Sequence, residues 1–172
     1  MAISLYDVSA LSFRAVLAGV AGYLEKSRAH AVAQGMSLDE LVDTRLHADM
    51  WPLRMQVIAV AQHSIGALRA AEAGVFTPPR PADLDYAGLQ GLIADGRKEL
   101  ETFTRERVEA LEGRDLEFRL GPNSMPFKVE DFFMSFSLPN LHFHATTAYD
   151  ILRMKGVPLG KRDYIAELRI KR

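Results

Sequence analysis

The sequence predicts an all-α protein built as a bundle of four long helices. Apolar residues recur at intervals of three and four through residues 8–34, 53–73 and 86–111, and a fourth such run begins near Glu130. A proline-rich stretch separates the second run from the third. Amphipathic helices of this length bury their apolar faces against one another. We therefore expect a four-helix bundle, with one domain over residues 1–172.

Composition narrows the class of protein. Lysine and arginine number 21 and aspartate and glutamate 22, so a broad basic surface for nucleic acid is not expected. The chain has no cysteine, which removes disulfides, thiolate nucleophiles and thiolate metal ligands. The N-terminal sequence lacks a basic segment followed by a long apolar run, and no uncharged stretch approaches membrane-spanning length. We expect a cytoplasmic protein with no nucleic-acid or membrane partner.

A short helix should follow the first long one. In residues 8–34, Ser9 can cap the start of the helix, and Gly35 follows as a stop. Ser37 stands three residues before Glu40, which is the sequence pattern of a capping box. The sequence thus predicts a second, short helix after helix 1.

The second and third long helices should be joined by a crossing loop. Residues 53–73 follow Pro52, which suits the first position of a helix. Residues 75–81 contain three prolines in four positions and are predicted to be a loop. The third helix is expected over residues 86–111, with an aspartate as its N-cap.

A small β-hairpin should precede the last long helix. Residues 116–120 and 125–129 alternate apolar and polar side chains, and residues 121–124 have turn chemistry. The last helix should start near Glu130. It contains Pro139, whose missing N–H is expected to kink the helix two to three residues earlier.

One face of the second long helix combines a histidine with small residues. It consists of Gln56, Val60, His63, Ala67 and Ala70, spaced by three and four. Small residues allow a neighbouring helix to approach closely, so His63 should point into the bundle.

The last helix has a matching inward face. His144 shares that face with Asn140, four residues earlier, and with Thr147. His142 lies about 200° away around the helix, so the two histidines of the His-x-His sequence do not form a clamp.

Two interpretations of His63 and His144 are open. Imidazole titrates near neutrality, so the pair could hold a metal ion or act as acid and base across the bundle. Alternatively, both are buried structural groups hydrogen-bonded to Asn140, Gln56 or Thr147.

Two polar clusters nearby also have alternative interpretations. His47 and Asp49 are either further ligands beside the mouth of the second helix or ordinary loop and cap residues. Tyr149, Asp150 and Arg153 either bind an anionic substrate or form a solvated helix face.

Several sequence blocks resemble the DinB/YfiT-like bundle superfamily, and within it a bacterial family of unknown function. The blocks are Leu5-Tyr-Asp-Val, Arg45-Leu with Asp49-Met and Pro52-Leu, Leu138-Pro-Asn, Phe143-His-Ala-Thr-Thr-Ala-Tyr-Asp-Ile-Leu-Arg, and Gly156-Val-Pro-Leu-Gly-Lys-Arg-Asp-Tyr. Together they span most of the chain. The resemblance implies a DinB-like bundle that forms a homodimer.

The resemblance also implies a metal site. The superfamily typically holds a divalent metal with three histidines, one on the second helix and two at i and i+4 on the fourth. His63 and His144 match two of these positions, and Asn140 stands at the third. An amide oxygen is a poorer ligand than imidazole for zinc or nickel. At most a weakly held zinc or nickel ion is therefore implied.

Two classes of function follow, and both are open. The first is a metal-dependent enzyme, a hydrolase or thiol-dependent transferase, acting in a polar pocket between the second and fourth long helices. The alternative is a non-catalytic bundle that binds a small molecule, or a structural dimer, that has lost a metal ligand. The expected pocket residues are His63, His144 and Asn140, with Gln56, Thr147, Tyr149, His47 and Asp49 around them.

Overall fold

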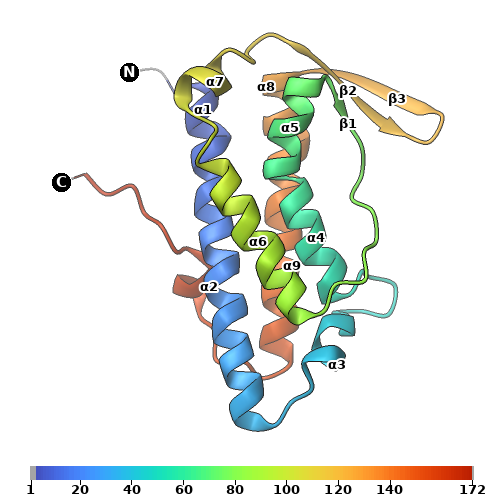
Figure 1. Ribbon diagram of the computed structural model, residues 1–172, viewed down its shortest axis with the longest axis vertical. Coiled ribbons are helices and arrows are strands. Elements are labelled where there is room, and N and C mark those ends of the chain that lie inside the picture. Colours follow the sequence, from blue (N-terminus) through green and yellow to red (C-terminus); the bar gives the residue numbers. More distant parts are fainter. Residues whose placement is uncertain (1–2, 172) are drawn as a thin grey trace.

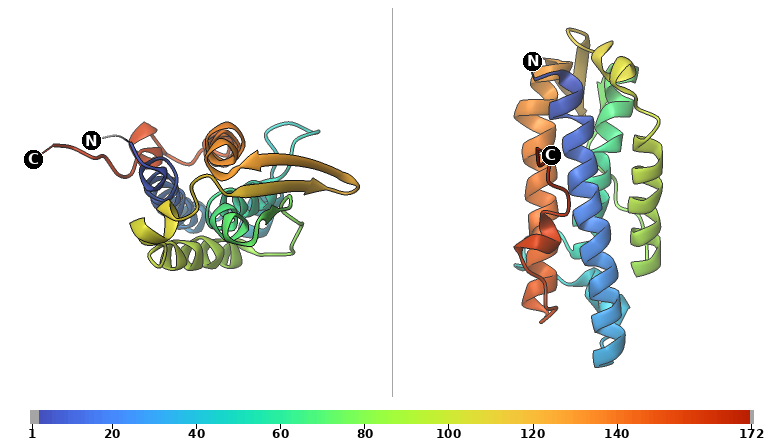
Figure 2. Two further views of the ribbon diagram at one scale, coloured as in Figure 1. Left: turned by 90° about the horizontal axis from the view of Figure 1, so that it is seen from above. Right: turned by 90° about the vertical axis from the view of Figure 1, so that its left-hand side faces the viewer.

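The structure, a computed structural model, describes residues 3–171 as a bundle of helices along one long axis (Figure 1). Within these residues, four long helical segments form the bundle: α2 (Ala10–Gln34), α4 with α5 (Leu53–Gln62, Ile65–Ala73), α6 (Tyr86–Leu100) and the segment ending in α9 (Leu138–Met154). Both α2 and α4 pack against α6 and α9. This closed arrangement, seen end-on in Figure 2, confirms the predicted bundle.

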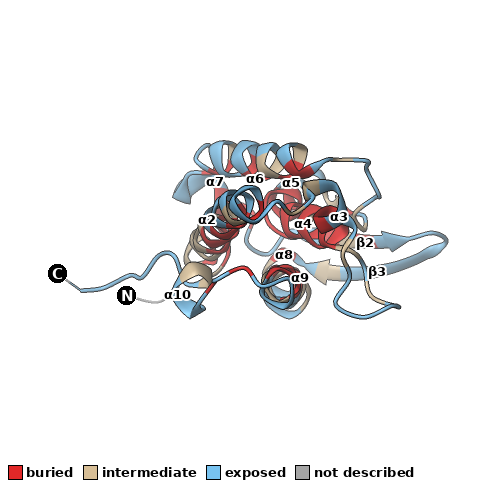
Figure 3. Ribbon diagram, turned by 90° about the horizontal axis from the view of Figure 1, so that it is seen from below, coloured by how far each residue is buried: buried red, intermediate tan, exposed pale blue. Residues whose placement is uncertain are grey.

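The core lies between the inward faces of the four segments. Figure 3 shows the buried positions concentrated there, with exposed residues on the outer faces. The helix α2 contributes Phe13, Leu17 and Val20, all fully buried. Burying side chains of this size contributes roughly 1.5–3 kcal/mol each, so this face holds the helix in the bundle.

The first long helix begins at Ala10, and a separate short helix precedes it. A short helix α1 (Leu5–Val8), capped by Ser4, leads into α2. Ser9 is at the predicted N-cap position of α2, but its hydroxyl makes no capping bond, because it donates to the carbonyl of Leu5 at 2.6 Å. The helix ends as predicted at Gly35, which has a φ of 65°.

The segment Leu5–Gln34 is long and apolar enough to cross a membrane by length and composition alone. The core helix of a globular bundle passes the same test. Since Phe13 and Leu17 are buried against the other helices, the structure uses this segment as a core helix.

The short helix after helix 1 is confirmed as α3 (Leu38–Asp43). The Ser37 hydroxyl accepts from the backbone N–H of Glu40 at 3.2 Å, which is one half of the expected capping box. Pro52 occupies the N-cap position of α4 and is therefore one residue before the first helical position, where it was predicted.

The second and third helices are each shorter than predicted. The second breaks at His63 and Ser64, where the Ser64 hydroxyl donates to the carbonyl of Val60 at 2.7 Å. The third ends at Leu100 and is followed by a separate helix α7 (Arg105–Glu109), capped by Thr104. Hydroxyl side chains that bond nearby backbone groups compete with the helical pattern, and sequence periodicity does not reveal this.

The predicted hairpin is confirmed as β2 (Asp115–Leu120) and β3 (Asn123–Lys128). The segment predicted to be a loop begins instead with a short strand, β1 (Val75–Phe76), which pairs in parallel with β2. It is an edge strand in the order β1-β2-β3. Proline lacks the N–H that a strand needs, so β1 ends before Pro78.

The last long segment is continuous but irregular. It consists of α8 (Val129–Phe132), a π-helical turn η1 (Phe133–Ser137), and α9. The π-helical turn lies where a distortion was predicted from Pro139. The hydroxyl of Ser137 donates to the backbone carbonyl of His63 at 2.8 Å, so the π-helical turn is bonded to the break between α4 and α5.

Candidate functional site

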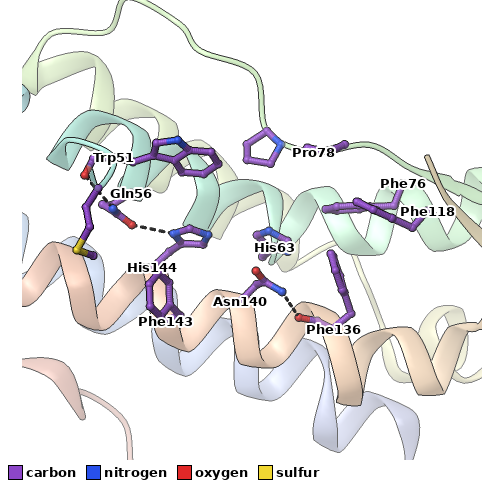
Figure 4. A pocket seen from close by; sticks show the side chains of 12 residues that line it. Trp51, Gln56, His63, Phe76, Pro78, Phe118, Phe136, Asn140, Phe143 and His144 are labelled. Atoms are coloured by element: carbon purple, nitrogen blue, oxygen red, sulfur yellow. Dashed lines mark hydrogen bonds between the residues drawn. The ribbon is translucent and has the colours of Figure 1, made fainter. Parts of the chain in front are cut away.

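A cavity of about 410 Å³ lies between α4, α9 and the small sheet (Figure 4). Its lining is mostly aromatic and apolar, with four polar side chains. The lining residues are Met50, Trp51, Gln56, His63, Phe76, Pro78, Pro79, Phe118, Phe136, Asn140, Phe143 and His144. No aspartate, glutamate, lysine or arginine among the described residues lines it. The cavity is therefore an uncharged site in the size range of small-molecule pockets.

His63 is positioned by the break that ends α4. Its backbone N–H donates to Ala59, and its carbonyl accepts from Ser137. The ring lies against those of Phe76 and Phe136, with centroid distances of 5.3 and 5.7 Å. His63 is 4% exposed. Local backbone irregularity thus places an imidazole deep in an aromatic wall.

His144 is held by a hydrogen-bond relay. Its Nδ1 lies 2.7 Å from Oε1 of Gln56, and Nε2 of Gln56 donates to the backbone carbonyl of Trp51 at 2.9 Å. The carbonyl of Trp51 requires a donor, which fixes the orientation of the Gln56 amide. The Nδ1 atom of His144 therefore has the proton and donates to Gln56, so Nε2 keeps a free lone pair.

The two histidines lie side by side in the wall. Their ring centroids are 5.7 Å apart, and their planes differ by 18°, so the predicted approach of His63 and His144 is confirmed. Burial, and to a lesser extent the nearby His144, lowers the pKa of His63 to about 3. Burial alone lowers the pKa of His144 to about 4. Both imidazoles are neutral at physiological pH.

Asn140 offers an oxygen to the same region. Its Nδ2 donates to the backbone carbonyl of Phe136 at 2.7 Å. Figure 4 shows the amide oxygen on the side that faces His63. Asn140 therefore adds an acceptor to the one on His144.

One polar atom of the wall is unsatisfied. Within residues 3–171, Nδ1 of His63 is buried and has no hydrogen-bond partner. Leaving a buried polar group without a partner costs about 1–3 kcal/mol. Such atoms are rare in native proteins and mark places where water, an ion or a ligand is expected.

Other predicted pocket residues lie outside the cavity lining. His47 and Asp49 pair with each other at 2.6 Å in the exposed loop before α4. The hydroxyl of Thr147 donates to the carbonyl of Phe143, one helical turn back. Tyr149 packs between two tyrosines, Tyr23 and Tyr164.

His142 is separated from His144, as predicted. Its Nδ1 lies 3.1 Å from the hydroxyl of Tyr164, on the opposite side of α9 from the cavity. The two histidines of the His-x-His sequence therefore lie on different faces of α9.

Most of the apolar lining was not identified as site residues from the sequence. Trp51 comes from the loop before α4, and its ring stacks on His144 with centroids 5.6 Å apart and planes 10° apart. Phe76 and Phe118 come from β1 and β2, where they are paired in register. As the only tryptophan in the chain, next to the helix that contains His63, Trp51 was the best available signal.

The donor set does not match a tight site for zinc or nickel. No group of three or more His, Cys, Asp or Glu side chains in the described part of the chain lies where it could hold a metal ion. Two imidazoles and one amide oxygen supply no negative charge, and an amide is a weak ligand for these metals.

The fold and site together define a DinB-like helical bundle with a pocket between its second and fourth long helices. A match over residues 5–165 to the family described as "Domain of unknown function (DUF1993)" shows that the chain belongs to that family. It is similar to a DinB family member from Shewanella denitrificans, whose crystal structure was determined at 1.83 Å resolution. The TM-score is 0.82 and the identity 27%, covering 98% of this chain and 95% of the other. No curated protein matches the chain.

Proposed function

We propose that the protein binds a small, uncharged, largely apolar molecule in the cavity between α4 and α9. The observation that carries the proposal is the uncharged aromatic lining around convergent polar groups. A charged molecule buried there would lose its hydration without gaining a counter-charge, which is strongly unfavourable. An uncharged ring gains from contact with the aromatic walls.

The cavity is large enough for such a molecule. A dry apolar cavity of about 150 Å³ already accepts benzene. At about 410 Å³, this cavity has room for a substituted or two-ring compound. Trp51 and Phe143 are 43% and 56% exposed, so two cavity-lining aromatic residues also face solvent and can flank an entrance.

Binding of an uncharged fluorescent probe tests the proposal. N-phenyl-1-naphthylamine emits strongly in apolar surroundings, so emission should rise with a saturable, one-to-one dependence on protein concentration. Asn140→Phe should weaken binding because the new ring occupies part of the cavity. His142→Phe places the same ring on the opposite side of α9 and should not. Absence of saturable binding, or equal loss in both variants, contradicts the proposal.

A divalent metal is the second candidate occupant. It is favoured by the short distance between two neutral imidazoles and by the unpartnered Nδ1 of His63. His63, His144 and Asn140 would be its ligands, and the weak donor set favours loose binding of zinc or nickel. Metal analysis of protein purified without a histidine tag or added metal should find less than stoichiometric zinc and nickel after dialysis. Stoichiometric metal would put the metal-dependent enzyme first.

The expected homodimer and cytoplasmic location stay predictions. Sedimentation of the purified protein measures the oligomeric state directly.

A further inference from the structure

Given the proposed function, the polar groups of the cavity further restrict the chemical class of the ligand. Three polar side chains lie close together in the wall: His63, His144 and Asn140. The direction of each hydrogen bond decides which kind of ligand group they can satisfy.

His144 presents an acceptor. Its Nδ1–H is used by Gln56, so the nitrogen left for a ligand is the unprotonated Nε2. Figure 4 shows that nitrogen on the side of the ring away from Gln56. The relay through Gln56 to the carbonyl of Trp51 holds this tautomer in place.

Asn140 presents a second acceptor. One N–H of its amide donates to the carbonyl of Phe136, and its oxygen faces the space near His63. His63 is neutral and can donate or accept from either nitrogen, depending on its tautomer. The fixed groups of the wall are thus acceptors.

We propose that the ligand is an aromatic compound with a neutral hydroxyl or N–H donor, a phenol or an indole-type amine, whose donor binds between His144 Nε2 and Asn140 Oδ1. Its ring lies against Trp51, Phe76, Phe118 and Phe136. A carboxylate or phosphate is rejected, because it would place negative charge beside two acceptors with no lysine or arginine in the described lining. An ether or a plain hydrocarbon fits the apolar walls but leaves the acceptors unpaired.

Calorimetric titration with three matched compounds tests the inference. They are 2-naphthol, 2-methoxynaphthalene and naphthalene-2-carboxylate, measured at pH 7.5, where the naphthol is neutral. We expect 2-naphthol to bind about tenfold more tightly than the ether, the ratio expected for one hydrogen bond of roughly 1.4 kcal/mol. The carboxylate should bind more weakly than both.

Two variants localise the effect. Asn140→Leu removes one acceptor and keeps a similar volume, and His144→Phe removes the other while keeping a ring against Trp51. In each folded variant, the ratio of naphthol affinity to ether affinity should fall several-fold relative to the parent.

The outcomes separate the two proposals. If the ether binds as tightly as the naphthol, donor recognition is wrong and the apolar binding site stands. Tightest binding of the carboxylate overturns both the donor class and the uncharged ligand. If neither neutral compound binds and the fluorescent probe also fails, the proposed function itself is wrong. Because the comparison among compounds is made on the parent protein, it holds even if a variant does not fold.

Discussion

The Nδ1 atom of His144 lies 2.7 Å from the side-chain oxygen of Gln56, and both residues are buried. Gln56 also donates to the backbone carbonyl of Trp51, in the loop before α4. One glutamine therefore connects a helix of the bundle, an imidazole of the cavity and the loop that brings the tryptophan ring to the cavity. Removing it would leave a donor and an acceptor unpaired at once.

Gln56→Leu should destabilise the protein by about 1–3 kcal/mol, the typical cost of a buried polar group without a partner. The free energy of unfolding in urea measures this. Gln62→Leu is the matched control, since Gln62 on the same helix donates to Thr77 but is only partly buried. The control should change stability by about 0.5 kcal/mol or less, as surface substitutions usually do. Equal losses would mean that the relay adds nothing.

Stability should fall as the pH drops below about 6.5, the ordinary pKa of histidine. The pKa values of His63 and His144 are lowered to about 3 and about 4 in the folded protein. The unfolded chain therefore binds these two protons more readily. Their contribution to stability is complete above about pH 6.5 and is lost progressively as the pH falls toward about 4 for His144 and about 3 for His63.

The expected slope is up to about 1.4 kcal/mol per pH unit for each of the two histidines. Urea unfolding at pH 7.5, 6.0 and 5.0 measures it. Burial also lowers the pKa of His142, so His142 contributes to the slope of the parent and of a His63 variant alike. A His63→Gln variant should show a shallower slope than the parent. An unchanged slope would show that His63 is not a buried neutral group.

Helical periodicity was enough to find the polar half of the cavity. His63, Gln56, Asn140 and His144 lie on faces that the spacing of apolar residues assigns to the interior, and the structure brings them together. Thr147 and Tyr149 were also expected in the pocket. In the structure, the Thr147 hydroxyl bonds to the preceding turn of α9, and Tyr149 packs against two other tyrosines. Periodicity identifies a buried face but does not predict at which level along the bundle axis a cavity lies.

The apolar half could not be found in the same way. Trp51, Pro78 and Pro79 belong to loops, and Phe76 and Phe118 to short strands. Their positions depend on how the chain folds back between elements, which no short-range pattern fixes. The break at Ser64 was missed because it depends on a side-chain hydroxyl bonding its own helix.

Two glycines on α2 should respond in opposite directions to the same substitution. A Cβ built on Gly19 would overlap the backbone carbonyl oxygen of Tyr164 in α10 (Lys161–Tyr164), whereas a Cβ on Gly22 meets nothing within 4 Å. Gly19→Ala should destabilise by about 1–3 kcal/mol, since backbone cannot move aside as a side chain does. Gly22→Ala should stabilise by about 0.5–1 kcal/mol through helix propensity. Urea unfolding of both variants checks this, and a neutral Gly19→Ala would mean that α10 is not docked on α2.

Asn140→His should create a metal site that the parent has only in part. The new imidazole would share a face of α9 with His144, four residues on, opposite His63 at the end of α4. Three histidines with positions left open for water are a common arrangement for zinc. A metal that binds only the folded state adds about 2.7 kcal/mol at a hundredfold excess over Kd. Added zinc or nickel should therefore raise the melting temperature of the variant by roughly 5–10 °C.

The comparison needs two reference proteins. The parent should respond much less, because its third donor is an amide oxygen. Asn123→His, which places a histidine at the exposed hairpin, should respond like the parent. If the parent responds as strongly as Asn140→His, then Asn140 is already an adequate ligand and the metal-dependent enzyme becomes the leading interpretation. If no protein responds, the two imidazoles are not oriented toward a common ion, and the cavity is a binding site for small molecules alone.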